Sequence, residues 1–403
     1  MANLLYLVHR LPYPPDKGDK VRSYHLLKHL VVKHRVFLGT FVDDAQDLQH
    51  IDTLRSLCGG LHVVRLQPQL ARLRSLAALL DGQALTLRYY ADAGMAEWVA
   101  RTVREQGIDT AVVFSSSMAQ YVERIPGLRM LVDFVDVDSA KWSQYAEARS
   151  WPMSWLYRRE GERLLAYERE MAMRARRSFF VTESETALFR DLAPECAGAI
   201  EPMGNGVDAE YFAPTAAPAR PSPFAADEVP IVFTGAMDYW PNVDAVCWFA
   251  SEVLPELRRV RPALRFHIVG RSPSAKVQAL AGPAVNVTGT VPDVRPYLQY
   301  AAVVVAPLRL ARGIQNKVLE AMAMGRPVVA STACAKVIDA RPGIDLLAAS
   351  EPADYVREIE VVLSDPALAL ALGRAGRQCV LDRYSWATHM GCIERHLEPE
   401  VAA

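Results

Sequence analysis

The sequence alternates short apolar runs with amphipathic helical patterns, and this alternation restricts the fold more than any other feature. The first run, residues 4–8, is followed by a loop rich in proline and charge and then by a helical pattern over 21–33. Strands that alternate with helices are typical of a parallel sheet with helices on both faces. Further strands are expected at 36–42, 61–66, 111–115, 128–132 and 179–182. The pattern predicts a doubly wound α/β fold.

A chain of 403 residues is too long for one ordinary domain, so two domains are expected. The same rhythm repeats after a stretch rich in alanine and proline, which is typical of a linker. The expected division is a first domain at 1–212, a linker at 213–228, a second domain at 229–380 and a C-terminal helix at 381–403.

Composition excludes several classes of protein. The net charge of -1, without a charged tail, argues against nucleic-acid binding. The 6 cysteines are scattered without CxxC pairs, as expected for free thiols in a reducing cytosol. No signal peptide or membrane-spanning run is visible, so a cytoplasmic protein is expected.

The stretch 312–331 reads as a loop, a short helix and a strand. Asn316 suits the helix N-cap, and Gly325 suits the left-handed position after the helix. Lys317 and Glu320 stand off the apolar stripe near the helix N-terminus, which favours a phosphate, while a carboxylate there can accept hydrogen bonds from ribose hydroxyls. The alternative is a buried helix whose Lys317 and Glu320 form a solvated pair.

Two glycines follow strands of the second half, at Gly235 and Gly270. A glycine there allows a phosphate to approach the backbone, and Arg271 adds a cation. Tight turns explain the same residues equally well. Neither GxGxxG nor the P-loop pattern occurs, which argues against ordinary dinucleotide and P-loop sites.

Carboxylates follow the strand expected at 128–132. Asp136 and Asp138, preceded by Asp133, have the spacing of a metal-binding pair, although turn formation and helix capping are the favoured reading. Asp136 is also a candidate polar partner or base. His9, at the end of the first strand, is a second catalytic candidate, although a lone histidine there is more often only hydrogen-bonded.

Two stretches have the character of membrane-surface helices, 70–80 and 149–177. The longer one carries eight arginines against four glutamates, with Trp151 and Trp155 at its start. Arginine and tryptophan favour the interface of an anionic leaflet. The favoured alternative is a long helix packed on the sheet with a charged outer face.

Several motifs occur in order and together resemble glycosyltransferase family 4, retaining enzymes of GT-B fold that use sugar nucleotides. They are Asn205-Gly-Val-Asp208 with Phe212-Ala-Pro214, Phe233-Thr-Gly235, Val269-Gly270, and Val318 to Val329. The segment 5–22 resembles a narrower branch, the sugar transferases associated with exosortase-type exopolysaccharide gene clusters. The resemblance implies two Rossmann-like domains facing across a cleft, with C-terminal helices that cross back to the first domain.

The resemblance assigns residues to the donor. Glu320 matches the second glutamate of the family's E-x7-E motif, which binds the ribose. Gly235 and Gly270 match backbone positions around the donor. Gly18 matches a glycine loop near the donor phosphates and the acceptor. Asp136 lies where the family often places a histidine that contacts the donor sugar.

This sequence departs from the family at two places. Arg312 replaces the first glutamate of E-x7-E, and Ala236 and Pro241 replace the usual cations after the first strand of the second domain. Because a diphosphate needs cations to offset desolvation, Arg312 and Lys317, with Arg271, are hypothesised to supply the lost charge.

The remaining expected contacts are Gly313 and Asn316 to the donor and Asp133 and Lys20 on the acceptor side. The expected function is transfer of a sugar from a UDP- or GDP-linked donor to a lipid-linked glycan, without a metal or other cofactor. The expected location is the cytoplasm, peripherally at the cytoplasmic face of the inner membrane. A sugar-nucleotide epimerase and a non-catalytic nucleotide-binding partner of another transferase remain the alternatives.

Overall fold

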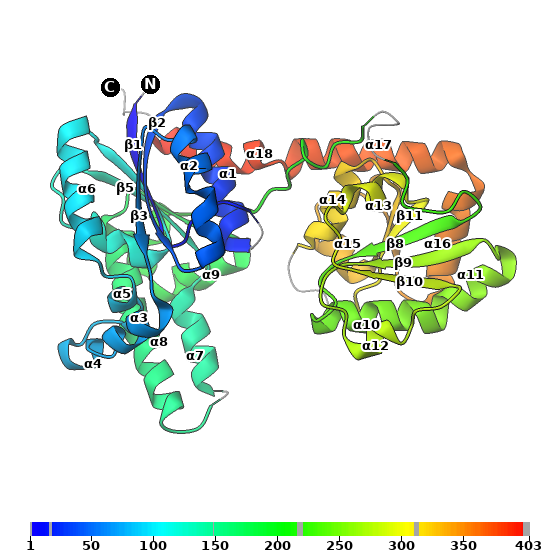
Figure 1. The fold of residues 1–403 in the computed structure, drawn as a ribbon, viewed down its shortest axis with the longest axis horizontal. Helices are drawn as coiled ribbons and strands as arrows, with labels where there is room; N and C mark the ends of the chain where they lie inside the picture. Colours follow the sequence, from blue (N-terminus) through cyan, green and yellow to red (C-terminus); the bar gives the residue numbers. More distant parts are fainter. Residues whose placement is uncertain (1, 16–17, 148, 216–220, 310–313, 398–403) are drawn as a thin grey trace. The chain divides into compact units, whose positions relative to one another are not determined.

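The structure, a computed structural model, describes residues 2–15, 18–147, 149–215, 221–309 and 314–397. The chain divides into two compact units (Figure 1). The first unit comprises Met1–Asn205 and His389–Ala403, and the second comprises Gly206–Thr388. The contact-based boundaries therefore lie at Asn205 and His389, rather than at 212 and 381, and residues 213–228 group with the second unit.

The first unit is built on a parallel sheet of seven strands in the order β3-β2-β1-β4-β5-β6-β7. The strands are β1 Asn3–Val8, β2 Arg35–Val42, β3 Gly60–Arg65, β4 Thr110–Phe114, β5 Arg129–Val135, β6 Arg177–Phe180 and β7 Ile200–Pro202. The apolar runs form these strands because both faces of a parallel sheet are buried. Leu5 and Leu7 of β1, for example, belong to one buried cluster with Met95 and Val99. The doubly wound fold is confirmed for this unit.

Helices connect these strands and cover the sheet. They are α1 Gly18–Lys33, α2 Ile51–Leu57, α3 Pro68–Ser75, α4 Ala78–Asp81, α5 Leu85–Tyr89, α6 Ala93–Gln106, α7 Asp138–Glu147, α8 Met153–Arg174 and α9 Glu183–Leu192, with 3-10 turns η1 Ala45–His50, η2 Ser116–Tyr121 and η3 Pro194–Ala199. Figure 1 shows α7 and α8 projecting beyond the sheet, with α3, α4 and α5 beside α8.

The second unit repeats this topology with six parallel strands in the order β10-β9-β8-β11-β12-β13. Its strands are β8 Val229–Thr234, β9 Leu264–Val269, β10 Val285–Gly289, β11 Val303–Ala306, β12 Val328–Ser331 and β13 Leu347–Ala349. Its helices are α10 Trp240–Trp248, η4 Phe249–Val253, α11 Leu254–Val260, α12 Ala275–Gln278, α13 Arg295–Tyr300, α14 Asn316–Ala323, α15 Thr332–Val337, α16 Pro352–Ser364 and α17 Pro366–Arg383. The last helix, α18 Trp386–Leu397, begins in this unit and continues into the first.

Several expected elements differ in the structure. The helix expected from 21 already begins at Gly18. In the second unit the sequence predicts one helix over 243–260, but a π-helical stretch, η4, interrupts it before Pro255. Proline cannot donate to the preceding turn, which accounts for a break there. The strands β7 and β13 are short, and β10 contains polar residues. The sequence analysis did not predict these three strands, because their burial depends on neighbouring strands.

The chain passes between the units twice, and two glycines flank the first passage, where each lies close to a residue of the second passage. A Cβ atom on Gly204 would lie 2.8 Å from the His389 ring in the first unit, and one on Gly206 would lie 2.6 Å from the Trp386 nitrogen in the second. Helix α18 contributes to both units, and its C-terminal part anchors to the first through Glu394, which pairs with His29 at 2.9 Å. None of the helices in the described ranges is long and apolar enough to span a membrane.

Candidate functional site

In each sheet the strand order reverses direction at one point, between β1 and β4 in the first unit and between β8 and β11 in the second. Ligands of doubly wound sheets bind outside the carboxyl ends of the strands at such a point. In the second unit, β8 ends at Thr234, followed by Gly235, and β11 ends at Ala306. Helix α14 follows β11, so its N-terminal residues belong to this edge of the sheet.

Lys317 reaches this edge from the first turn of α14. Its ammonium donates a hydrogen bond to the side-chain oxygen of Asn242 and lies 4.7 Å from the centre of the Phe233 ring. Asn242 is buried, and its amide nitrogen donates to the carbonyl of Ala236 at 2.8 Å. One side chain thus fixes both the loop after β8 and the lysine.

Burial lowers the pKa of Lys317 to about 8. The charged ammonium has lost much of its hydration, and its only described hydrogen-bond partner is the neutral amide of Asn242. An anion beside this ammonium would restore the missing stabilisation. Asn242 was missed by the sequence analysis, because nothing local links residues 75 positions apart.

Glu320 lies one turn further along α14 and is half-buried. Burial raises the pKa of Glu320 to about 7, against the charge of Lys317, which lowers it. Its carboxylate has no hydrogen-bond partner in the described part of the chain, and it forms no ion pair with Lys317, whose ammonium turns to Asn242 instead. The solvated pair considered as the alternative is therefore not formed, and both groups remain available to a ligand.

Gly235 and Gly270 bring the ends of β8 and β9 into backbone contact. The amide of Gly235 donates to the carbonyl of Val269 at 3.0 Å, and a Cβ atom built on Gly270 would lie 1.7 Å from the carbonyl oxygen of Gly235. A side chain on Gly235 would meet Asn242 at 2.7 Å and the ammonium of Lys317 at 3.3 Å. Both glycines are thus required by packing next to Lys317.

Other expected donor residues have different outcomes. Helix α14 has Gln315 as its N-cap, without a side-chain cap, so Asn316 is the first helical residue and the expected cap is corrected. Gly325 adopts the predicted left-handed conformation, with φ of 64°. Arg312 and Gly313 lie outside the described residues. Arg271 is exposed, and its carbonyl accepts from the amide of Met237 at 2.8 Å.

The nearby cation Arg309 follows β11, but it is already paired. Its guanidinium donates to both carboxylate oxygens of Asp244 on α10. It also borders a cavity of about 260 Å³ at the carboxyl ends of β11 and β12. Arg309 therefore contributes less unpaired charge than Lys317.

At the reversal point of the first unit, His9 follows β1 and stacks on Phe114, the last residue of β4, with 5.8 Å between the ring centres. Its Nε2 lies 3.5 Å from Asp19, which also accepts from Arg10 at 2.7 Å. Burial raises the pKa of Asp19, but the hydrogen bond with His9 and the charge of Arg10 outweigh it and lower the pKa overall. His9 Nδ1 is buried and has no hydrogen-bond partner in the described ranges.

Two residues at this edge have a strained backbone. Ser115 after β4 has φ of 76°, and Val135 at the end of β5 has φ of 70°. A β-branched residue rarely adopts this conformation, and such strain costs on the order of 1–3 kcal/mol. Strained residues concentrate at functional sites, so the carboxyl edge of this sheet is a second candidate region.

Two expected acceptor-side residues instead hold the first unit together. Lys20 is buried and its ammonium donates to Asp47 at 2.8 Å. Asp133 is buried and accepts two hydrogen bonds from Arg22, at 2.8 and 3.0 Å. Arg22 also donates to the side chain of Asn205 at 2.9 Å, which accounts for the asparagine at the end of this unit. Neither expected contact is exposed to a ligand. Gly18, the glycine expected near the phosphates, is exposed as the first residue of α1.

Asp136 and Asp138 share one cation rather than facing each other across an empty site. Lys141 lies 2.7 Å from Asp136 and 3.1 Å from Asp138. Burial lowers the pKa of Lys141, but the two carboxylates raise it by a larger amount, so the net shift is upward. The described residues contain no group of three or more histidines, cysteines or acidic residues with metal-site geometry.

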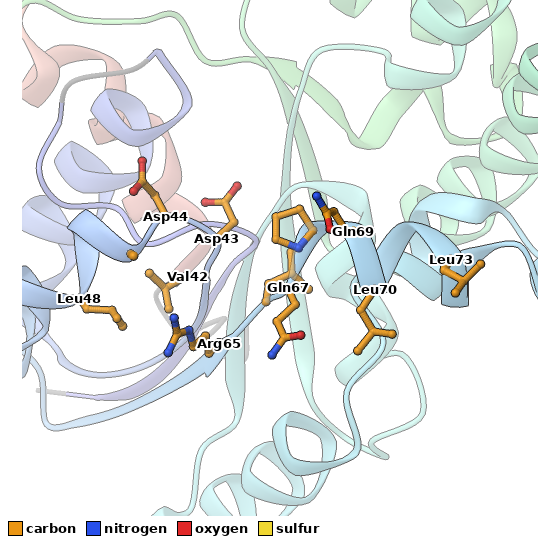
Figure 2. Close-up of a pocket in the computed structure, with 12 residues that line it drawn as sticks. Val42, Asp43, Asp44, Leu48, Arg65, Gln67, Gln69, Leu70 and Leu73 are labelled. Carbon is orange, nitrogen blue, oxygen red and sulfur yellow. The ribbon is translucent and has the colours of Figure 1, made fainter.

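A pocket of about 510 Å³ lies at the carboxyl ends of β2 and β3 in the first unit (Figure 2). Its wall combines apolar side chains with charged and amide groups: Val42, Asp43, Asp44, Ala45, Leu48, Arg65, Leu66, Gln67, Pro68, Gln69, Leu70 and Leu73. Asp43 also accepts from Arg10 at 3.0 Å, which connects the pocket to the cluster around His9. The sequence analysis assigned none of the pocket's lining residues to the site.

A match to a protein family covers the part of the chain that carries Lys317 and Glu320. Residues 228–365 match the family described as Glycosyl transferases group 1. The matched residues all lie within the second unit. The match supports the expected class of enzyme, and it covers the strands and helices that carry Gly235, Lys317 and Glu320. No curated protein gave a significant match.

Solved structures resemble the whole chain. The sucrose-phosphate synthase of Thermosynechococcus elongatus has a TM-score of 0.64 at 18% identity, over 98% of this chain and 99% of that one. HepE of Anabaena, in complex with UDP, has a TM-score of 0.65 at 15% identity, over 98% and 99%. WaaG, a glycosyltransferase involved in lipopolysaccharide biosynthesis, has a TM-score of 0.60 at 15% identity, over 98% and 100%. These likenesses confirm the predicted GT-B fold of two Rossmann-like units.

Proposed function

We propose that the protein transfers a sugar from a nucleotide donor to a lipid-linked glycan acceptor in the synthesis of an exopolysaccharide, with retention of configuration. The observation that carries the proposal is Lys317, a half-buried ammonium at the reversal point of the second sheet, with Glu320 beside it. Among the described residues, no carboxylate pairs with Lys317 and no cation pairs with Glu320. That combination suits a diphosphate next to a ribose. Structures of Anabaena HepE in complex with UDP, with UDP and glucose, and with UDP-glucose support this class of donor.

The role of Lys317 follows from charge. Cleavage of the bond between sugar and diphosphate leaves additional negative charge on the diphosphate. A fixed cation and the free N–H groups at the start of α14 stabilise that charge more strongly in a dry site than water would. Arg312 and Arg271 are the further cations in this proposal, and Glu320 accepts hydrogen bonds from the ribose.

The acceptor is proposed to bind in the first unit, at the edge that holds His9 and the pocket near β2 and β3. Polar groups at this edge suit sugar hydroxyls: the buried Nδ1 of His9 and hydroxyl of Ser116, which have no hydrogen-bond partner among the described residues, and the carboxylates of Asp43 and Asp44. Asp136 and His9 remain the candidates for contact with the reacting sugar. No metal takes part in the proposed reaction.

A thermal-shift screen with UDP, GDP and their sugars tests the donor site. A ligand that binds only the folded protein raises its Tm according to its affinity, so one nucleotide should raise it and Lys317→Met should abolish that rise. A transfer assay with the selected donor then separates the functions. Release of a free epimer without acceptor, or tight binding without turnover, would contradict the proposed transfer.

A further inference from the structure

Large apolar side chains are exposed on two neighbouring segments of the first unit. On α3, α4 and the turn between them, Leu80 is 93% and Leu73 is 66% exposed. Where α7 turns into α8, Trp151 is 79% and Trp155 is 53% exposed. We call the exposed residues of these segments the leucine–tryptophan surface: Leu70, Leu73, Leu76, Leu79, Leu80, Trp151, Met153 and Trp155. Exposed side chains of this size in such number mark an interaction surface.

Hydrogen bonds connect the two segments. Arg159 of α8 donates to the carbonyls of Ala78 and Gln83, at 2.6 and 3.1 Å, and so ties α8 to both ends of α4. Trp155 precedes Arg159 by one helical turn and therefore lies on the same side of α8. Next to Arg159, the buried Glu160 accepts from the amides of Leu85 and Thr86, at 2.6 and 2.9 Å.

The turn between α7 and α8 is supported by close packing. A Cβ atom on Gly161 would lie 2.7 Å from the hydroxyl of Ser143, so the two helices approach closely there. Trp142 packs against Tyr145 and Tyr157, with ring centres 6.0 and 5.2 Å apart. The tryptophans are therefore presented on a packed helical hairpin.

The charge of these segments is strongly positive. Residues 68–81 and 149–159 contain five arginines and one aspartate, whereas the whole chain has a net charge of -1. Arg72, Arg74, Arg149 and Arg158 are exposed among the apolar side chains. Arginine, tryptophan and leucine together suit the interface of a bilayer with anionic headgroups.

We propose that the leucine–tryptophan surface docks the protein onto an anionic lipid bilayer. A second copy of the chain is a poorer occupant, because a two-fold contact would set this arginine-rich surface against itself. The pocket near β2 and β3 shares Leu70 and Leu73 with the surface. Docking therefore places the pocket beside the bilayer, where the lipid-linked acceptor of the proposed function would be found.

Vesicle co-sedimentation tests the proposal on the full chain without donor. The protein should bind vesicles that contain phosphatidylglycerol, bind phosphatidylcholine vesicles weakly, and be released by salt. Trp151→Ser with Trp155→Ser, and separately Leu73→Ser with Leu80→Ser, should each reduce binding at least tenfold. Arg72→Gln with Arg74→Gln should reduce it about fivefold per arginine.

Matched controls lie outside the surface. Val260→Ser with Leu370→Ser removes apolar side chains that are 66% and 54% exposed in the second unit, and Arg101→Gln with Arg104→Gln removes exposed cations of α6. These variants should bind vesicles as the parent does. No binding of the parent, equal loss in the controls, or a concentration-dependent dimer that the surface variants abolish would overturn the proposal.

Membrane docking rests on the proposed function only for the reason why the protein would bind a bilayer. The docking proposal and the donor assignment can therefore fail separately. The nucleotide-induced rise in Tm, measured without vesicles, should be the same in the parent and in the surface variants. If that rise is absent while vesicle binding persists, the donor assignment fails and the docking surface stands.

Discussion

Lys317 and Glu320 have opposite pKa shifts with the same physical cause. Burial disfavours both charged forms, so the pKa of Lys317 falls to about 8 and that of Glu320 rises to about 7. Since no ion pair joins them, each group gains when a ligand supplies the missing partner. Burial of Lys317 and Glu320 therefore determines the expected pH dependence of nucleotide binding.

Affinity for the nucleoside diphosphate should be greatest between about pH 7 and pH 8. Above about pH 8 the ammonium of Lys317 is lost, and affinity should fall up to about tenfold per pH unit. Below about pH 7 Glu320 is protonated and loses its capacity to accept two hydroxyl hydrogen bonds. Titration calorimetry across pH measures both limbs.

Two variants separate the alkaline limb, which is the fall in affinity above about pH 8, from the acid limb, which is the fall below about pH 7. Lys317→Arg should remove the alkaline limb, because a guanidinium stays protonated throughout. Glu320→Gln should remove the acid limb. In the ligand-free protein, burial of the charged ammonium of Lys317 costs stability at low pH. Between about pH 8 and pH 10 the folded protein has already lost this proton while the unfolded chain still binds it, so the free energy of unfolding should rise with pH. An alkaline limb that survives in Lys317→Arg would exclude Lys317 as its source.

Asn242 positions Lys317, and its replacement should weaken binding without direct contact to the ligand. Asn242→Ala should lower nucleotide affinity about tenfold, because a hydrogen bond to a charged group contributes roughly 1.5–3 kcal/mol. Asn242→Asp should keep the geometry but raise the pKa of Lys317, which moves the alkaline limb to higher pH.

Asn286 provides the control for this prediction. Its amide lies 3.2 Å from His267, so Asn286→Ala also removes a part-buried hydrogen bond of the same unit but leaves Lys317 untouched. Equal loss of affinity in Asn242→Ala and Asn286→Ala would show a general effect of stability instead of positioning.

At the scale of elements, the site depends on how closely the ends of β8 and β9 approach. Gly270→Ala should destabilise the second unit severely, since its Cβ would lie 1.7 Å from the carbonyl oxygen of Gly235. We expect a loss of several kcal/mol in the free energy of unfolding, as for other severe backbone clashes. Gly282→Ala is the control, because its Cβ meets nothing within 4 Å. Similar melting curves for both variants would contradict this account.

The same scale explains why sequence reading succeeded for most elements. Strands with continuous apolar runs, such as β1 and β2, were predicted to within a residue, because both faces of each are buried. The strands β7 and β13 have three residues each, too few to show a period. The break at η4 was missed because the helical apolar pattern continues across it.

At the scale of the whole molecule, each unit brings different groups to the reversal point of its own sheet. The second carries Lys317 and Glu320, which have no ion-pair partner in the ranges that the structure describes. The first carries His9, a strained edge and the pocket of Figure 2. This difference is the basis on which we propose a donor site in the second unit and an acceptor site in the first.

Chelation tests the proposed reaction as a whole. Transfer should continue in excess EDTA, because Lys141 already neutralises Asp136 and Asp138 and the diphosphate is proposed to be held by protein cations. The rate should stay within about twofold of the untreated enzyme. Loss of transfer in EDTA with recovery on addition of Mg²⁺ or Mn²⁺ would contradict the metal-free reaction.

The sequence by itself determined the doubly wound units, the glycines at the strand ends and the helix that carries Lys317 and Glu320. These features depend on local periodicity and backbone conformation, which neighbouring residues encode. Only the tertiary structure decided that Lys317 turns to Asn242, and that Lys20 and Asp133 are buried in ion pairs. Such pairings join residues far apart in the chain, and their energies depend on burial that no local pattern records.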